Sequence, residues 1–223
     1  MKALTTLNDT IWSEKSVKCF WERNKAPFAG DVKASEILRL SRPFCKDRIL
    51  DVGAGSGALV DALFLKREIV VGIDTTPRHH HLVIQASVAA LPFGDKSFDT
   101  VYATDVLEHL TDDVLMEGLT EIQRVMSTGA YFITVVPYNE ILEQNLVSCP
   151  RCDILFHRWG HVQSFSQDKI VKLLVELGFR VVKIVALPLG MMAEHWLIQH
   201  FWRLFVQLDF LKLSDYFVIA EKK

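Results

Sequence analysis

The sequence predicts an α/β protein built on a doubly wound, mostly parallel sheet. Apolar, β-prone runs alternate with helical patterns from about residue 45 to Val136, as in parallel strands joined by helices. The first of these runs leads into the glycine-rich turn Gly53-Ala-Gly-Ser-Gly57, the kind of turn that lets a ligand approach bare backbone. With 223 residues, half of them hydrophobic, the chain is long enough to bury a sizeable core.

We expect one domain, 1–223, with four consecutive parts. These are an N-terminal helical cap (1–44), a cofactor-binding core (45–137), an insert (138–164) and a C-terminal part (165–223) that contains an apolar helical insert (190–213). Apolar periodicity and turn residues predict the elements within these parts. Strands are expected to end at Asp51, Asp74 and Thr104, and two more to span 179–187 and 215–221. Helices are expected over 58–65 and 166–177, and a third from about Val106.

The spacing of the glycines favours one kind of ligand. Gly53, Gly55 and Gly57 form G-x-G-x-G, whereas dinucleotide-binding loops read G-x-G-x-x-G. Asp51 stands two residues before Gly53, where its carboxylate would repel a pyrophosphate but accept hydrogen bonds from an ammonium group. The loop therefore indicates a cofactor with an amino-acid end. The alternative is a plain connecting turn, which rarely needs three glycines in five residues.

Asp74 ends the second expected strand, about 20 residues after the glycine loop. An acidic residue at that distance, in a strand-helix-strand unit, binds the two hydroxyls of a ribose. It also precedes Thr75-Thr76-Pro77 and is thus a candidate helix cap, a role that is compatible with ribose binding.

Two further segments carry a family resemblance. Leu91–Asp99 reads LPFGDKSFD and Val106–Leu110 reads VLEHL, while Arg124–Ala130 precedes the fifth expected strand. Together with the glycine loop, they resemble the class I S-adenosylmethionine-dependent methyltransferases of the small-molecule branch, over about residues 45–138. The resemblance implies a Rossmann-like sheet of seven strands with an antiparallel last strand over Asp215–Ala220, and S-adenosyl-L-methionine as cofactor.

By the same resemblance, the cofactor-binding residues lie on the loops that follow the first four strands. They are Asp51, Gly53, Ala54, Gly55, Gly57, Asp74, Thr75, Ser87, Val88, Thr104 and Asp105. One departure concerns the adenine, because related proteins often carry a carboxylate before the LPF turn and this chain has Gln85-Ala-Ser-Val88 there. We therefore expect Ser87 or a backbone group to bind the ring.

No obligatory catalytic residue is expected, because methyl transfer depends mainly on positioning and needs a base only for some acceptors. His109 is the candidate, placed one turn into the helix expected from Val106. The alternative is an ordinary histidine with a structural hydrogen bond. Asp105 is likewise a candidate for either a ligand-binding role or a helix cap.

The insert contains a candidate zinc site. Cys149 and Cys152 are spaced C-x-x-C, and His157 and His161 follow, so that four potential ligands of one Zn²⁺ lie within thirteen residues. Other readings of the two cysteines are a redox dithiol or two unpaired thiols in a substrate loop. His161 also belongs to a GH-x-x-x-F segment common in these methyltransferases.

Residues 191–213 are apolar and aromatic on most of their helical circumference. Four charges argue against a transmembrane span. The segment is expected to pack on the sheet, to contact a membrane surface peripherally, to form a homodimer face, or to wall an apolar acceptor site. Together with the insert 138–164, it is expected to form the roof of that site, above an acceptor with a large apolar portion.

The composition of the chain argues against some classes of binding partner. A net charge of −2 and the absence of basic runs argue against nucleic acid. No secretory signal and no disulfide framework is visible, which indicates a cytoplasmic protein. The leading hypothesis is methyl transfer to a small-molecule or lipid-linked acceptor. The competing hypotheses are a non-catalytic methyltransferase-like binding protein and, less favoured by the glycine spacing, a nicotinamide oxidoreductase.

Overall fold

The structure is a computed structural model that describes residues 29–65, 69–78, 80–151, 153, 155–207 and 211–223. Its first half contains α3 (Ala29–Ser41), η1 (Arg42–Phe44), β1 (Arg48–Val52), α4 (Ala58–Phe64), β2 (Ile69–Asp74), β3 (Val83–Gln85), β4 (Phe98–Thr104), η2 (Leu107–His109), α5 (Asp112–Val125) and β5 (Met126–Pro137). Its second half contains η3 (Leu142–Asn145), β6 (Leu146–Ser148), β7 (Leu155–His157), α6 (Gln167–Glu176), β8 (Phe179–Leu187), α7 (Leu189–Glu194), α8 (Trp196–Gln207) and β9 (Asp215–Lys222).

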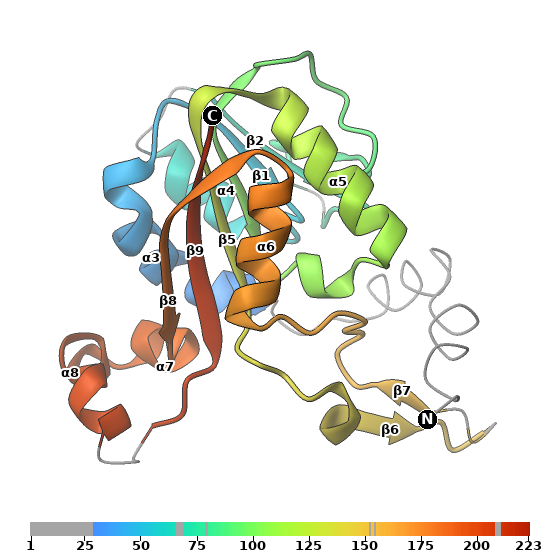
Figure 1. Ribbon diagram of the computed structural model, residues 1–223, viewed down its shortest axis with the longest axis vertical. Helices are drawn as coiled ribbons and strands as arrows, with labels where there is room; N and C mark the ends of the chain where they lie inside the picture. Colours follow the sequence, from blue (N-terminus) through green and yellow to red (C-terminus); the bar gives the residue numbers. More distant parts are fainter. Residues whose placement is uncertain (1–28, 66–68, 79, 152, 154, 208–210) are drawn as a thin grey trace.

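Seven strands form one sheet in the order β3-β2-β1-β4-β5-β9-β8 (Figure 1). Strands β3, β2, β1, β4 and β5 pair in parallel, whereas β9 pairs antiparallel with β5 on one side and β8 on the other. The predicted Rossmann-like, mostly parallel sheet with an antiparallel last strand is therefore confirmed. Strand order reverses at β1 and β4, so that their carboxyl ends flank the position where such sheets bind ligands.

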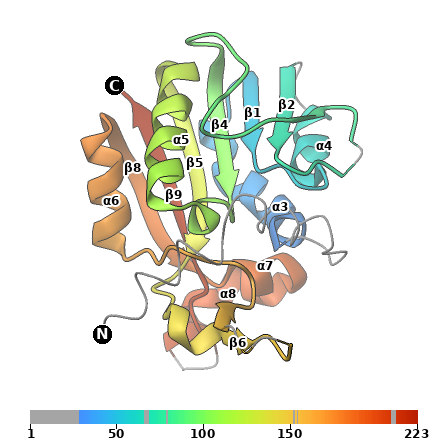
Figure 2. The same cartoon turned by 90° about the vertical axis from the view of Figure 1, so that its right-hand side faces the viewer.

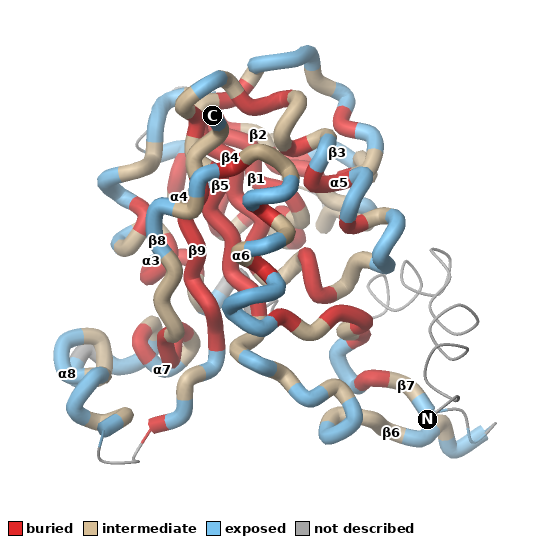
Figure 3. Tube along the Cα trace, in the orientation of Figure 1, coloured by how far each residue is buried: buried red, intermediate tan, exposed pale blue. Residues whose placement is uncertain are grey.

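Helices cover both faces of the sheet and bury two apolar layers. One layer joins β4 and β5 to α5 and α6, through residues such as Leu119, Ile122 and Leu174. The other joins the sheet to α3, α4 and α7, through residues such as Ile37, Leu63 and Leu189. The strands at the centre are buried along most of their length, whereas α8 and the β6–β7 hairpin are largely exposed or half-buried (Figure 3). Burial on both faces is why the strands read as nearly continuous apolar runs.

The helix predicted from Val106 does not form as expected. The structure has a short 3-10 turn, η2, and α5 begins only at Asp112. The carbonyl oxygen of Glu108 explains the difference, because it accepts hydrogen bonds from the backbone N–H groups of Val162 and Gln163, at 2.8 and 3.0 Å. The insert thus occupies an acceptor that a continuing helix would need, and His109 lies in a turn rather than one turn into a helix.

The expected single apolar helix of residues 191–213 is two helices with a break. His195 has an extended backbone between α7 and α8, and residues 208–210 lie outside the described part. The break lets both helices contact α3: α7 buries Met192 in the second apolar layer, and Gln199 of α8 donates a 2.6 Å hydrogen bond from Nε2 to Glu36 Oε2.

Both inserts lie beyond the carboxyl ends of the parallel strands (Figure 2). Figure 1 places α7 and α8 on one side of that edge and the β6–β7 hairpin on the other. Of the predicted N-terminal cap, residues 29–44 fall within the described part and form α3 and η1, and Lys33 of α3 reaches the same edge. Among the described helices, none is long and apolar enough to cross a membrane.

Candidate functional site

The glycine loop is a rigid turn after β1. Gly53, Gly55 and Gly57 all have positive φ angles, of 72°, 53° and 86°, which residues other than glycine adopt only with strain. The loop is tied to the neighbouring strand, because the Ile73 carbonyl oxygen accepts hydrogen bonds from the N–H groups of Gly53 and Ala54, at 2.8 and 2.9 Å. The loop is therefore held in one conformation, and the side chains of Val106 and His80 fill the space that a Cβ on Gly53 or Gly57 would occupy.

Asp74 links this loop to the end of β2. Its Oδ2 accepts a hydrogen bond from the Gly55 N–H at 2.9 Å, and its Oδ1 accepts one from the Thr76 N–H at 2.7 Å. Oδ2 has capacity for a second hydrogen bond, whereas Oδ1 already has a second, longer one from the Thr76 hydroxyl at 3.4 Å, which a ribose hydroxyl would replace. The half-buried carboxylate therefore fits the role of binding two ribose hydroxyls while it holds the loop. Thr75 is exposed, and its carbonyl oxygen accepts a hydrogen bond from Gln85 Nε2.

The other predicted cofactor residues occupy neighbouring positions. Asp51 is 2% exposed and lies in β1 between Gly72 and Tyr102 of the adjacent strands. Strand β1 continues one residue beyond the predicted end, to Val52. Val88 is buried against α5, and the neighbouring Ser87 Oγ accepts a hydrogen bond from the Ala89 N–H at 3.2 Å.

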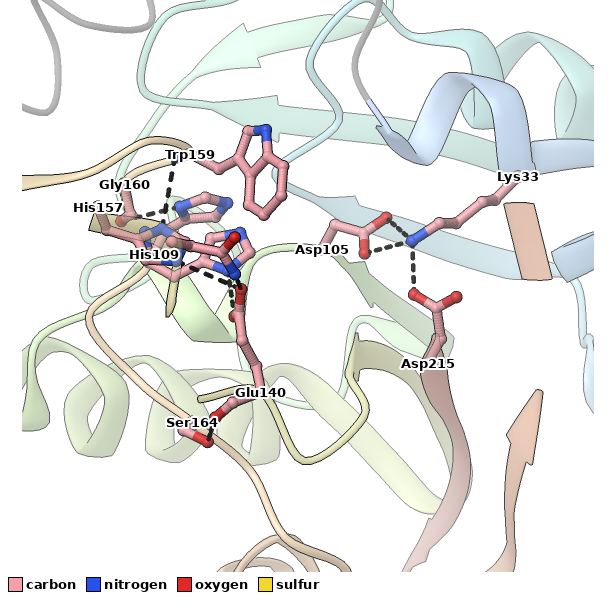
Figure 4. A network of polar contacts seen from close by, with 11 residues as sticks. Lys33, Asp105, His109, Glu140, His157, Trp159, Gly160, Ser164 and Asp215 are labelled. Carbon is pink, nitrogen blue, oxygen red and sulfur yellow. Dashed lines mark hydrogen bonds and ion pairs between the residues drawn. The ribbon is translucent and has the colours of Figure 1, made fainter. Parts of the chain in front are cut away.

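A buried ion-pair cluster stands at the end of β4, directly after Thr104 (Figure 4). Lys33 Nζ lies 2.8 Å from Asp105 Oδ1 and 2.6 Å from Asp215 Oδ1, so that α3, β4 and β9 are joined at one point. Asp105 has a left-handed backbone with φ of 54°, an uncommon conformation for a non-glycine residue that often marks functional sites. The sequence predicted Asp105 here but not Lys33 or Asp215.

In this cluster, burial and the ion-pair partner groups act in opposite directions on the pKa of Lys33 and on that of Asp105. Burial by itself lowers the pKa of Lys33, but Asp105 and Asp215 outweigh that effect and raise it, so the ammonium stays charged. Burial raises the pKa of Asp105, and Lys33 opposes the rise. Two carboxyl groups thus depend on one ammonium group for compensation.

A histidine cluster lies beside this ion pair, where η2 meets the insert (Figure 4). The ring of His161 stacks on that of His157 at 4.6 Å between centroids and meets the ring of His109 edge-on at 4.8 Å. Glu140 Oε2 lies 2.5 Å from His161 Nδ1, and Glu140 Oε1 lies 3.3 Å from His157 Nε2. The predicted pair His157 and His161 does converge, but around a carboxylate.

The cysteines do not complete this cluster in the described part of the chain. Cys152 lies outside the described residues. Cys149 belongs to neither of the groups of described His, Cys, Asp and Glu residues that are arranged to hold a metal ion. Those groups are Glu108, His109 and His161, and Glu140, His157 and His161.

His109 and Glu108 are strongly affected by burial. Burial and the neighbouring His161 lower the pKa of His109 to about 3, so its imidazole is neutral near pH 7. Such a weakly basic group is poorly matched to general-base catalysis at neutral pH. Glu108 is 1% exposed, and burial followed by the charge of Asp105 raises its pKa.

Sequence reasoning missed four residues of this region: Lys33, Glu108, Glu140 and Asp215. Glu108 stands next to His109 in the VLEHL segment, and that adjacency is a signal that could have identified it. The other three come from segments far apart in the sequence, and no spacing connects them.

Replacing Gly55 with valine is expected to weaken cofactor binding at least tenfold and leave the fold intact. A β-branched residue at φ of 53° is strained by about 1–3 kcal/mol, and relief of that strain would move the backbone that faces the ligand. Calorimetry with S-adenosylhomocysteine measures the affinity. Gly190→Val is the matched control, because no atom lies within 4 Å of a Cβ added there. Equal affinity in Gly55→Val and wild type would contradict the role of this loop.

Comparison with known proteins gives a consistent result. Residues 50–134 match the methyltransferase domain family. The chain is 26% identical over 190 residues to an O-methyltransferase of Pyrenophora dematioidea, covering 74% of this chain and 68% of that protein. It is 28% identical over 155 residues to the O-methyltransferase rstn1 of Aspergillus nomiae, covering 61% and 65%, so it spans about two thirds of these relatives' length.

Among solved structures, the fold is similar to that of the 1,6-didemethyltoxoflavin-N1-methyltransferase of Burkholderia thailandensis. The TM-score is 0.59 at 15% identity, over 99% of this chain and 88% of that one. That protein was solved with 1,6-didemethyltoxoflavin and S-adenosylhomocysteine bound. At this identity the similarity concerns the fold.

Proposed function

The chain belongs to the class I S-adenosylmethionine-dependent methyltransferases, and from this premise we propose that it methylates an oxygen atom of a small acceptor with a substantial apolar part. The observation that carries the proposal is the arrangement of Asp74 and the three left-handed glycines at the carboxyl edge of β1 and β2. The oxygen acceptor is suggested by the two fungal relatives, which are named O-methyltransferases.

The residues present fit the cofactor. The backbone of Gly53 and Gly55 would face its amino-acid end, with Asp51 close by, and Asp74 would bind its ribose hydroxyls. When bound, S-adenosylmethionine supplies a methyl group on a positively charged sulfur. The chain's part is then to hold the two reactants in line and to exclude water, which accounts for much of the rate in such transfers.

The ion-pair cluster would form the polar floor of the acceptor site. Asp105 directly follows β4, the strand next to β1, and its contact with Lys33, which also binds Asp215, fixes its carboxylate in place. Helix α3 then connects this floor to α8 through the Glu36–Gln199 hydrogen bond.

Helix α8 supplies the reason to expect an apolar acceptor. Leu197, Phe201 and Leu204 are each about half exposed, at 48%, 52% and 51%, on a helix near the ligand edge. An exposed apolar group of this size is typical of a surface that meets an apolar ligand or a lipid. A non-catalytic binding protein, the alternative, is not favoured by relatives that are named as enzymes.

The test is an assay for S-adenosylhomocysteine release with matched acceptors. Long-chain phenols, alcohols and quinols are compared with amines of the same chain length, and mass spectrometry locates the added methyl group. We expect methylation of the oxygen compounds, increasing with chain length. Products from amines alone would contradict the oxygen assignment, and failure to bind S-adenosylhomocysteine would contradict the function as a whole.

Replacing Phe201 and Leu204 with serine is expected to reduce turnover of long-chain acceptors, with stability changed by no more than about 0.5 kcal/mol, because both side chains are half exposed. Trp202→Ser is the contrasting variant, since Trp202 packs against the second apolar layer and its loss should lower the melting temperature. Unchanged turnover, or dissociation of a dimer on light scattering, would show that α8 is not part of the acceptor site.

A further inference from the structure

Two groups of potential metal ligands share His161. In one, ligand atoms of Glu108, His109 and His161 lie within 4.8 Å of one another; in the other, the same holds for Glu140, His157 and His161. Both lie where η2 meets the insert, beside the ion-pair cluster (Figure 4). The hydrogen bonds around the rings distinguish the two groups.

His109 and His161 are held in the tautomer that a metal ligand needs. His109 Nδ1 lies 3.2 Å from the carbonyl oxygen of Gly160, which can only accept, so Nδ1 carries the proton and Nε2 has the lone pair. His161 Nδ1 faces Glu140 Oε2 at 2.5 Å, and the carboxylate sets the same tautomer. Histidine ligands of metals usually donate their second N–H to a carbonyl or carboxylate in this way.

His157 is held in the opposite tautomer. Its Nδ1 accepts a hydrogen bond from the His161 N–H at 3.1 Å, so that in the neutral ring Nε2 carries the proton. That nitrogen cannot coordinate a cation without losing its proton. Glu140 is already engaged with His161, so the group of Glu140, His157 and His161 suits a supporting role rather than direct coordination.

The third member of the first group is an unsatisfied carboxylate. Glu108 is 1% exposed, and its Oε2 has no hydrogen-bond partner among the described residues. A buried carboxylate oxygen without a partner is costly, and buried charges are normally paired or bound to metal. Two further carboxyl groups, Asp105 and Asp215, share the single charge of Lys33, and a third, Glu140, lies against His161. A divalent cation would therefore satisfy both the orphaned oxygen and the surplus of carboxyl groups.

We propose that Glu108, His109 and His161 bind one divalent ion of the zinc type, with Glu140 and the Gly160 carbonyl orienting the two imidazoles. Three protein ligands leave a coordination position open, as in catalytic zinc sites. On the proposed function, that position would take the acceptor oxygen, whose proton a cation makes easier to remove. This ligand set replaces the one expected from Cys149, Cys152, His157 and His161, of which only His161 is retained.

The test measures metal binding directly. Protein without a purification tag is stripped with a chelator, and Co²⁺ and then Zn²⁺ are titrated by absorption spectroscopy and calorimetry. We expect one equivalent to bind to wild type and binding to weaken by more than about 100-fold in Glu108→Gln. Glu140→Gln should weaken it by about 10- to 100-fold, as for other residues that orient a ligand. Glu143→Gln, an exposed glutamate of the same insert, is the matched control and should bind normally.

A stability measurement, one further variant and one ligand distinguish the possible outcomes. Metal-free Glu108→Gln should melt at or above the temperature of metal-free wild type, because the amide is a neutral group of the same size as the buried carboxyl group and cannot ionise. The double variant Cys149→Ser/Cys152→Ser should keep full affinity. Absence of stoichiometric binding in wild type, retention in Glu108→Gln, or loss in the cysteine variant would overturn the proposal. Binding of S-adenosylhomocysteine by the metal-free protein tests the proposed function independently.

Discussion

Replacing Asp74 with alanine is expected to weaken S-adenosylhomocysteine binding by at least about 100-fold. The variant loses two hydrogen bonds from ribose hydroxyls to a charged acceptor, each worth about 1.5–3 kcal/mol, and each 1.4 kcal/mol corresponds to about tenfold in affinity. It also loses the bond from Asp74 Oδ2 to the Gly55 N–H, which fixes the loop. Isothermal titration calorimetry measures the difference.

Two further variants serve as an intermediate case and a control for this prediction. Asp74→Asn retains one acceptor oxygen and should fall between alanine and wild type. Asp95→Ala, which removes an exposed carboxylate paired with Arg124, should bind normally. If Asp74→Ala bound the ligand as tightly as wild type, the ribose assignment would be wrong.

Replacing Lys33 with methionine is expected to destabilise the fold by about 3–5 kcal/mol near neutral pH. The substitution leaves Asp105 and Asp215 buried without their shared counter-charge, and breaking a buried ion pair by removal of one partner typically costs this much. Chemical denaturation of both proteins at the same pH measures the difference in free energy of unfolding. Lys172→Met is the control, because its ion pair with Glu176 is exposed and should contribute little.

The pH dependence of this deficit follows from the raised pKa of Asp105. A carboxyl group with a folded-state pKa above its unfolded value binds its proton more tightly when folded, so stability is lost as pH rises through the folded pKa. Without Lys33 to oppose that rise, the effect should be larger. The deficit of Lys33→Met should therefore shrink as pH falls towards about 4, the ordinary range for an aspartate. A deficit that stays constant from pH 4 to 7 would show that lost packing, not charge, is its cause.

The doubly wound sheet and the cofactor loop could be predicted from the sequence, because their determinants are local. Glycines with positive φ, an acidic residue after each of two apolar runs, and the period of buried strands are all readable within about 30 residues. Strand β8 and the antiparallel β9 were predicted within a residue of their observed bounds. Two helical predictions were wrong, because contacts with distant segments compete with local helix propensity. The helix expected from Val106 is interrupted where the insert donates hydrogen bonds to the Glu108 carbonyl oxygen, and the helix expected over 191–213 is broken into α7 and α8, which both contact α3.

The fold and the positions of the glycine loop, Asp51 and Asp74 at the sheet edge follow from the sequence alone, whereas the contacts around Lys33 and His161 depend on the tertiary structure. Asp105 lies 72 residues and Asp215 lies 182 residues after Lys33 along the chain, yet both carboxylates bind the Lys33 ammonium group. Likewise His161 was predicted with two cysteines, but folding places it against Glu140 and near Glu108. The physical reason is that interactions between charged or metal-binding groups depend on how far apart and how deeply buried the groups are. Both quantities are set by the folding of the whole chain and not by local sequence.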